Sequence, residues 1–106
     1  MKEIKFLGDS LKRIREFSDD IQAKIGQQLR KIQDGLQPED FKPMSIIGRG
    51  VFEIRIRDAA GAFRVFYVVK KIDTIYILHV FQKKTQETPK KEIDLARKRY
   101  ETIKGV

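Results

Sequence analysis

The stretch from Val51 to Lys84 constrains the fold more than any other part of the chain. It contains three apolar runs at short spacing, and turn residues separate these runs. Successive side chains of a β-strand point to opposite faces, so short apolar runs between turn signals predict strands. Antiparallel strands are the ones that turns of a few residues can connect. The stretch therefore predicts a three-stranded antiparallel meander, with basic side chains on part of its surface.

Alternation assigns the side chains of the first two strands to two faces. One face is apolar and consists of Phe52, Ile54, Ile56, Phe63, Val65, Tyr67 and Val69. The other face carries the charged side chains and consists of Glu53, Arg55, Arg57, Arg64, Phe66 and Val68. The turn between the strands is Asp58 to Gly61, where Gly61 can supply positive φ. We expect the apolar face to pack on helices and the charged face to be open.

The third strand, Thr74 to Phe81, is apolar on both faces, which is typical of a central or well-covered strand. A second turn, Lys70 to Asp73, precedes it. The strand contains His79, the one histidine of the chain. Within an apolar run, a buried and hydrogen-bonded histidine is a commoner outcome than a functional one. Residues 82–88 are polar and predict a loop.

The N-terminal residues predict a short strand followed by a helix. Residues 2–7 alternate weakly, so we expect an edge strand in which Ile4 and Phe6 face the core. Asp9 or Ser10 can then cap a helix that runs through residue 17.

A second helix follows at once and forms a helical hairpin with the first, or continues it after a kink. Ser18 and the two acids after it suit a helix N-terminus, and Gly35 suits a left-handed C-terminal residue. The apolar stripe of this helix consists of Ile21, Ile25, Leu29 and Ile32. Gly26 lies inside the helix, where it lowers stability by about 1 kcal/mol against alanine. Such a glycine can permit close contact with a neighbouring element.

Two connecting segments and a C-terminal helix complete the chain. Residues 36–44 contain two prolines and predict a loop, and residues 45–50 predict a short strand or connector. Thr88 as N-cap and Pro89 at the first helical position open the last helix. Its apolar stripe consists of Ile93, Ala96, Tyr100 and Ile103, and its basic face of Lys90, Lys91, Arg97, Lys98 and Lys104. The sum is an α+β domain, with helices on one side of a small antiparallel sheet.

Composition limits the kinds of partner and site. The 106 residues suit a single domain, 1–106, and the formal net charge is +8. A surplus of positive charge favours a polyanion as partner, namely RNA, DNA, an acidic protein or a membrane surface, although it also serves solubility. With no cysteine and one histidine, we expect no metal site and no cofactor.

Targeting signals are not visible in the sequence. Residues 1–9 lack the apolar core of a secretory signal. No run approaches the roughly 20 apolar residues that a membrane span requires. We therefore expect a cytoplasmic protein that does not act at a membrane.

Five groups of residues, in this order and spacing, carry a family resemblance. They are Glu53-x-Arg55, Gly61-x-x-Arg64-x-x-Tyr67 and Phe81-x-Lys83-Lys84-Thr85, followed by Thr88-Pro89 and Glu92-Ile93. Together with the order of elements, they resemble the HigB-like, phage-derived branch of the RelE/ParE toxin superfamily. The resemblance spans residues 2 to about 99. It implies a RelE-like fold and a toxin of a type II toxin–antitoxin module.

The resemblance further implies an activity and partners. Many such toxins are ribosome-dependent endoribonucleases, or mRNA interferases, and a helix-turn-helix antitoxin of the HigA-like kind neutralises them. Their working residues are basic and aromatic side chains on the concave face of the sheet. The positions here that would be catalytic are Arg55, Arg64, Lys83 and Lys84. The positions that would bind RNA are Arg57, Tyr67, Phe81, Lys90 and Lys91.

These residue types suit RNA cleavage without a metal. An RNA 2′-hydroxyl can attack the adjacent phosphate, and a protein can align it, stabilise the charged phosphorane and move protons. Arginine binds phosphate through two parallel hydrogen bonds. A lysine whose pKa is lowered by neighbouring cations can accept a proton. With one histidine in the chain, a pair of histidines cannot supply the acid and the base.

Each of these positions also has a purely structural interpretation. Strand parity places Tyr67 on the face opposite Arg64, so Tyr67 is a core residue unless a bulge intervenes. Glu53 and Arg55 can form a cross-strand ion-pair set, Arg64 can be a solvated strand residue, and Lys83 and Lys84 can belong to an ordinary basic loop. The alternative functions are a ParE-like poison of DNA gyrase and a non-catalytic, basic module that binds nucleic acid.

Overall fold

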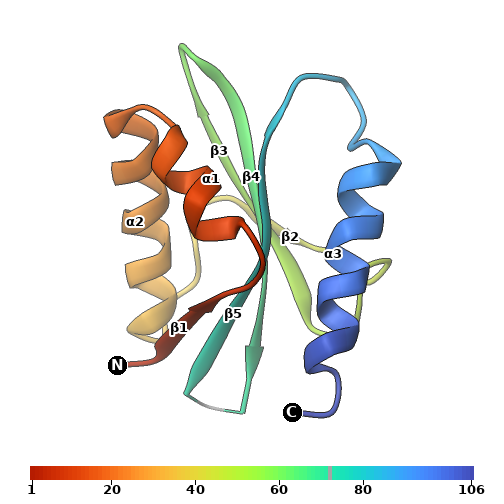
Figure 1. Ribbon diagram of the computed structural model, residues 1–106. Coiled ribbons are helices and arrows are strands. Elements are labelled where there is room, and N and C mark those ends of the chain that lie inside the picture. The colour runs from red at the N-terminus through yellow and green to blue at the C-terminus, as the bar shows by residue number, and fades with distance from the viewer. Residues whose placement is uncertain (72) are drawn as a thin grey trace.

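A five-stranded mixed β-sheet forms the middle layer of the protein, and helices cover both of its faces (Figure 1). The computed structural model describes residues 1–71 and 73–106. The strands are β1 (Glu3–Phe6), β2 (Phe41–Pro43), β3 (Val51–Asp58), β4 (Gly61–Lys70) and β5 (Thr74–Lys83), in the spatial order β1-β5-β4-β3-β2. The helices are α1 (Ser10–Glu16), α2 (Asp19–Gln33) and α3 (Lys90–Ile103). The α+β class predicted from the sequence is confirmed.

The antiparallel meander is present as predicted. Strand β4 pairs with β3 on one side and β5 on the other, and both pairings are antiparallel. In the first turn the Asp58 carboxylate accepts a hydrogen bond from the amide of Ala60 at 2.7 Å, and Gly61 has a φ of 134°. The predicted second turn includes residue 72, which lies outside the described residues.

The predicted division of β3 and β4 into two faces is confirmed, and each face belongs to a separate core. The charged face is not open as expected, because α3 covers part of it and Glu53 and Arg64 are buried. The face covered by α1 and α2 buries Ile21, Ile25, Leu29, Ile32, Ile54, Ile56, Phe63, Val65, Tyr67, Ile75, Ile77 and Val80. The face covered by α3, called the α3 face below, buries Met44, Ile47, Val51, Phe66, Val68, Tyr76, Leu78, Phe81, Ala96, Tyr100 and Ile103. Ile4 and Phe6 pack against the first core, as expected.

The expectation that the helices lie on one side of the sheet is wrong. Figure 1 shows α1 and α2 on one side and α3 on the other. The cause is the apolar character of β4 and β5 on both faces, because side chains such as Phe66 and Leu78 also need cover. The sheet is also not purely antiparallel, since β1 pairs in parallel with β5, with Ile4 opposite Ile75.

Segment 36–44, expected to be a loop, contains the short strand β2. Phe41 pairs with Ile54, and its ring packs edge-on against Phe52 at 5.8 Å. An edge strand tolerates proline because its outer side needs no partner, which explains Pro43 at the end of β2. Residues 45–50 form turns that lead from β2 to β3, so the connector interpretation of this segment is confirmed.

The helix ends follow the predicted signals in part. The Ser18 hydroxyl accepts a hydrogen bond from the amide of Ile21 at 3.3 Å. After α2, Gly35 has a φ of 81°, and the amide of Leu36 donates to the carbonyl of Lys31 at 2.8 Å, as in a Schellman motif. Pro89 is itself the N-cap of α3 rather than its first helical residue. Proline fits either place because its fixed φ suits both.

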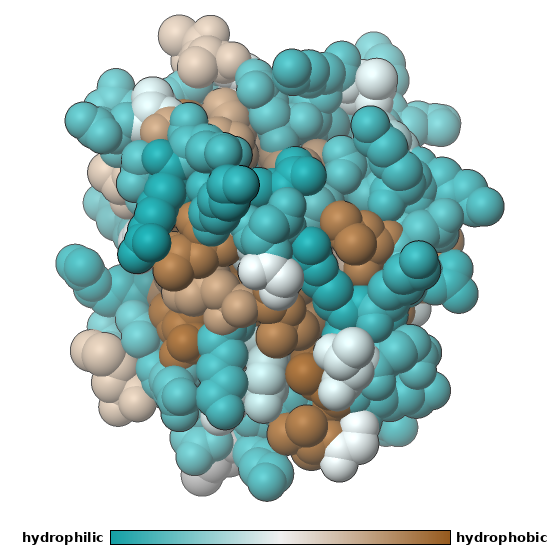
Figure 2. All heavy atoms as spheres, in the orientation of Figure 1, coloured by the Kyte–Doolittle hydropathy of each residue, from teal (hydrophilic) through white to brown (hydrophobic). Residues whose placement is uncertain are grey.

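Hydrophobic side chains gather between the helical layers. In the view of Figure 2, hydrophobic residues lie mainly over the edge of the sheet, and the outer sides of the helices are hydrophilic. Within residues 1–71 and 73–106, none of the helices combines the length and the apolar character needed to cross a bilayer.

Gly26 does not mediate a close contact, contrary to the sequence-based expectation. It is exposed on α2, and an added Cβ would meet no atom within 4 Å. We expect Gly26→Ala to raise the free energy of unfolding by about 0.5–1 kcal/mol, because alanine loses less backbone entropy in a helix. Urea denaturation measures this change. Gly48→Ala is the contrasting variant, since its Cβ would lie 2.6 Å from the Tyr100 ring, and it should destabilise. A loss of stability in Gly26→Ala would contradict the packing described.

Candidate functional site

Three strands bring basic side chains together around one acidic residue on the α3 face. The acid is Glu53 of β3. Lys42 of β2 is its cross-strand partner, and Arg55 of β3 is the cross-strand partner of Arg64 of β4. Because residues two apart on a strand share a face, Glu53 and Arg55 point the same way. Lys42, Arg55 and Arg64 therefore converge on one carboxylate.

The Glu53 carboxylate is buried, with 1% of the residue exposed. Its Oε1 lies 3.4 Å from Arg55 Nε and 4.0 Å from Lys42 Nζ, and its Oε2 lies 3.7 Å from Arg64 Nε. Two of these atoms, Glu53 Oε2 and Arg64 Nε, have no hydrogen-bond partner among the described residues. Charge therefore holds this pair together more than hydrogen bonding does.

Arg64 is also buried, with 3% exposed. Its Nη1 donates a hydrogen bond to the carbonyl of Phe63 at 3.1 Å. Burial lowers the pKa of Arg64, and the charge of Glu53 opposes this effect. An arginine stays protonated in proteins even so. The site thus contains a fixed guanidinium cation at the base of the uncovered part of the α3 face.

An open concavity of about 440 Å³ lies beside this cluster. We call it the basic concavity, and it is lined by Arg57, Ala62, Arg64, Lys83, Lys84, Thr85 and Gln86. Lys83 lies opposite Ala62 in the ladder of β4 and β5. Its pKa is lowered, first by burial and then by the charge of Arg64. A lysine with a lowered pKa exchanges protons more readily near neutral pH.

Four of the sequence-predicted site residues meet in the basic concavity, namely Arg57, Arg64, Lys83 and Lys84. Arg55 joins them indirectly, because it shares the Glu53 carboxylate with Arg64. Arg57 and Lys84 are exposed and Arg55 is partly exposed. The grouping expected from strand parity is therefore present in the fold.

The aromatic candidates and the helix lysines do not line the basic concavity, although Phe81 is the cross-strand partner of Arg64. Tyr67 is buried in the core under α1 and α2, on the face opposite Arg64, and burial raises its pKa to about 12. The register shift in β4 and β5 beside Tyr67 does not bring it to the α3 face. Phe81 is 1% exposed and its ring stacks on His79. Lys90 and Lys91 are exposed at the start of α3 and do not line the basic concavity.

Two residues of the cluster were not among the sequence-based candidates. Lys42 lies in the segment expected to be a loop, so no signal placed it beside the meander. Glu53 was recognised only as a possible ion-pair partner of Arg55. A usable signal was the position of Glu53. It is the one acid among the alternating arginines of its strand face, and this face also carries apolar side chains that need cover.

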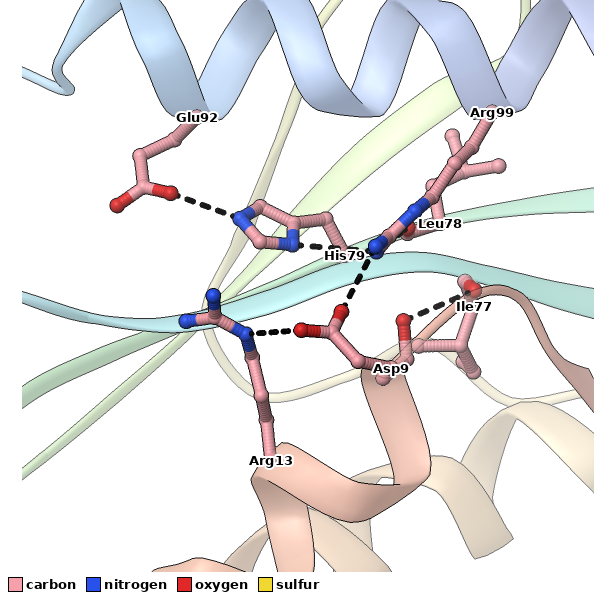
Figure 3. Close-up of polar contacts among 8 residues, drawn as sticks. Asp9, Arg13, Ile77, Leu78, His79, Glu92 and Arg99 are labelled. Atoms are coloured by element: carbon pink, nitrogen blue, oxygen red, sulfur yellow. Dashed lines mark hydrogen bonds and ion pairs between the residues drawn. The ribbon is translucent and has the colours of Figure 1, made fainter.

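A second polar cluster fastens α3 to the sheet (Figure 3). His79 of β5 is fully buried, and its Nε2 lies 2.8 Å from Oε1 of Glu92 on α3. Its Nδ1 lies 3.4 Å from Nη1 of Arg99, which also donates to the carbonyl of Leu78 at 3.0 Å. Arg99 Nη2 donates to the Asp9 carboxylate at 2.7 Å. The cluster therefore connects the start of α1, β5 and α3.

The partners of His79 determine its protonation. Arginine can only donate, so Nδ1 facing Arg99 is an acceptor, and the proton lies on Nε2 facing Glu92. This is a neutral imidazole. Burial lowers the pKa of His79, which Glu92 opposes and Arg99 reinforces. Arg13 and Arg99 lower the pKa of Asp9 well below its usual range. His79 is thus a structural, hydrogen-bonded histidine, the commoner of the two outcomes weighed from the sequence.

Comparison with known proteins identifies a family. Residues 12–101 match the family described as phage-derived protein Gp49-like (DUF891). The matched segment contains the whole sheet except β1, the Glu53 cluster and the basic concavity. A search of curated proteins finds no match.

Stability should fall as the pH is lowered through the range in which an exposed histidine titrates. In the unfolded chain His79 takes up a proton near pH 6.5, but the folded protein does so only at lower pH. Between these two values the unfolded state binds more protons, so the free energy of unfolding declines, by at most about 1.4 kcal/mol per pH unit for one proton. Asp9 contributes a separate loss only below its ordinary pKa of 3.8.

His79→Gln is the matched variant for this prediction. A glutamine amide can donate to Glu92 and accept from Arg99, but it does not titrate. Urea denaturation between pH 7 and pH 5 should give a declining free energy of unfolding for the wild type and a flatter one for the variant. Equal slopes in the two proteins would show that His79 does not titrate as described.

Proposed function

This chain belongs to the Gp49-like family of phage-derived proteins, a family of toxins of the type II toxin–antitoxin kind, and we propose that it is the toxin of such a module. In this proposal it is a HigB-like, ribosome-dependent endoribonuclease that cleaves mRNA and so inhibits translation. A single RelE-like domain, residues 1–106, carries the activity and acts in the cytoplasm. The observation that carries the proposal is the convergence of Arg57, Arg64, Lys83 and Lys84 on one concavity.

Charge supports RNA as the substrate. The chain has a net charge of +8. Among residues 1–71 and 73–106, four cations and no acidic side chain line the basic concavity. Phosphate contacts of this kind supply most of the affinity for nucleic acids. Thr85 and Gln86 line the same concavity, and they offer neutral donors and acceptors for base edges or sugar hydroxyls.

The proposed reaction is an attack by an RNA 2′-oxygen on the adjacent phosphorus. Lys83, in its neutral form, accepts the proton of the 2′-hydroxyl while the O2′–P bond forms. The P–O5′ bond breaks, and the leaving 5′-oxygen takes a proton from the Lys84 ammonium. The products are a 2′,3′-cyclic phosphate and a 5′-hydroxyl end. Arg64 and Arg55 stabilise the charge on the phosphorane through guanidinium hydrogen bonds.

The proposal also includes partners. A helix-turn-helix antitoxin of the HigA-like kind would neutralise the toxin by placing an acidic segment on the same cations. Lys90 and Lys91, exposed at the start of α3, are then available for contacts with ribosomal RNA or with the mRNA. In this proposal Tyr67 and Phe81, which are buried, support the strands that carry the arginines.

Lys83→Ala is the variant that tests the proposal most directly. The side chain is partly exposed, so its removal should leave the fold intact. We expect induced expression of the wild type to arrest growth and of Lys83→Ala to permit it, with a loss of cleavage of about 10²-fold or more. Lys12→Ala, an exposed lysine of α1 on the other side of the sheet, should behave as the wild type.

Mapping of mRNA 5′ ends after induction distinguishes the functions. Cuts within translated regions, in frame with codons and absent in Lys83→Ala, support the proposal. Growth arrest with a DNA-damage response and uncut mRNA would instead identify a gyrase poison. No effect on growth, together with salt-dependent binding of nucleic acid, would identify a binding module. Arg64→Ala alone is less informative, because it removes one of the three cations that pair with the buried Glu53 carboxylate and so also lowers the stability of the fold.

A further inference from the structure

We infer that Glu53 is a positioning residue of the proposed site, whose buried carboxylate holds the Arg55 and Arg64 guanidinium groups in the arrangement that receives the RNA phosphate. This inference rests on the proposed function. Glu53 itself does not line the basic concavity, so it acts through the arginines rather than on the substrate.

The first argument is geometric. One carboxylate collects cations from three adjacent strands, with Lys42 and Arg55 at Oε1 and Arg64 at Oε2. Each oxygen therefore orients a different arginine. Long cationic side chains on a strand face otherwise have many rotamers, and ordering them on binding would cost entropy. The buried Glu53 carboxylate, with 1% of the residue exposed, already orders the arginines in the free protein. Their side-chain entropy is therefore not lost when the substrate binds.

The second argument concerns repulsion between like charges. Arg55 and Arg64 are direct cross-strand partners, and two like charges in that relation destabilise a sheet. Glu53 lies between them in the ion-pair arrangement. It therefore allows two guanidinium groups to remain close together in the free protein, as a preorganised site for a phosphoryl group requires.

The third argument is that stability alone does not explain a buried charge here. Glu53 lies opposite Phe66 in the ladder, at the margin of the apolar core of the α3 face. A buried ion pair often stabilises less than well-packed apolar side chains would. The Nε–H of Arg64 is moreover not engaged in a hydrogen bond with any described residue. That nitrogen is buried and faces Glu53 Oε2 at 3.7 Å, so the carboxylate and not the substrate orients it.

Removal of the Glu53 charge should therefore affect binding and chemistry in opposite directions. Glu53→Gln keeps the size of the side chain but leaves the cationic face with one more net positive charge. Phosphate binding should be retained or become tighter, while the arginines lose their fixed arrangement. A displacement of about 1 Å in such a site can lower a rate about 10²-fold.

The experiment compares four proteins: the wild type, Glu53→Gln, Glu53→Asp and Glu101→Gln. Glu101 is exposed on α3, so its variant is matched in charge but distant in role. Affinity is measured with a single-stranded 2′-O-methyl RNA oligonucleotide, which cannot be cleaved, at several salt concentrations. The rate is measured as single-turnover cleavage of mRNA on ribosomes at saturating toxin. Arginine Nε–H resonances in ¹⁵N NMR spectra report the order of Arg55 and Arg64 without reference to activity.

For Glu53→Gln we expect an affinity for the oligonucleotide within about threefold of the wild type, or tighter. The saturating cleavage rate should fall by about 30-fold or more. The Arg64 Nε–H signal should be lost. Glu53→Asp, which keeps the charge on a shorter side chain, should recover part of the rate. It also replaces Glu53→Gln if the latter does not fold. Glu101→Gln should match the wild type throughout.

Two results would overturn the inference. One is a saturating rate in Glu53→Gln equal to that of the wild type. The other is a parallel fall of affinity and rate that matches a loss of folded protein, which would indicate a purely structural role. If the wild type cleaves no RNA, the proposed function fails and NMR decides on the inference. Arg64 signals lost in Glu53→Gln but present in Glu101→Gln then support positioning, and unchanged signals refute it.

Discussion

The burial of β4 and β5 on both faces is the constraint on which the rest of the structure depends. Each face needs an apolar cover, and the chain supplies it from opposite ends, α1 with α2 before the meander and α3 after it. In Figure 1 the β3–β4 hairpin extends past the start of α3. Arg57 and Arg64 lie in this part of the sheet, so the cations gather where the helical cover ends.

The attachment of α3 combines an apolar stripe with a polar clamp. Tyr100 and Ile103 contribute to the core of the α3 face. Glu92 and Arg99 contact the buried His79, and Arg99 also donates a hydrogen bond to Asp9 at the start of α1. Buried polar groups stabilise only when each is paired, and His79 has a partner for both ring nitrogens. The clamp therefore fixes the orientation of α3 on the sheet more strictly than apolar contacts alone would, and with it the end of the loop that carries Thr85 and Gln86.

Local patterns predicted much of this fold, and the failures in strand pairing share one physical cause. Alternation assigned Tyr67 and Arg64 to opposite faces, and the caps at Ser18 and Gly35 followed from local backbone chemistry. Long-range pairing was not readable in the same way. Strand β2 depends on the contact of Phe41 with Phe52 of the neighbouring strand. The parallel pairing of β1 with β5 depends on how α1 and α2 pack on the sheet. For the same reason Lys42 could not be connected to Glu53.

The two buried acid–base clusters illustrate opposite uses of charge on one face of a sheet. Around His79 the hydrogen bonds are complete, and the result is a rigid joint. Around Glu53 the cations outnumber the carboxylate and an oxygen and a nitrogen are left without hydrogen bonds. Such a surplus is unfavourable for the isolated fold, because like charges repel and buried donors need acceptors. A phosphate bound at the proposed site would reduce the repulsion among the cations, whereas Glu53 Oε2 and Arg64 Nε are buried and stay out of its reach.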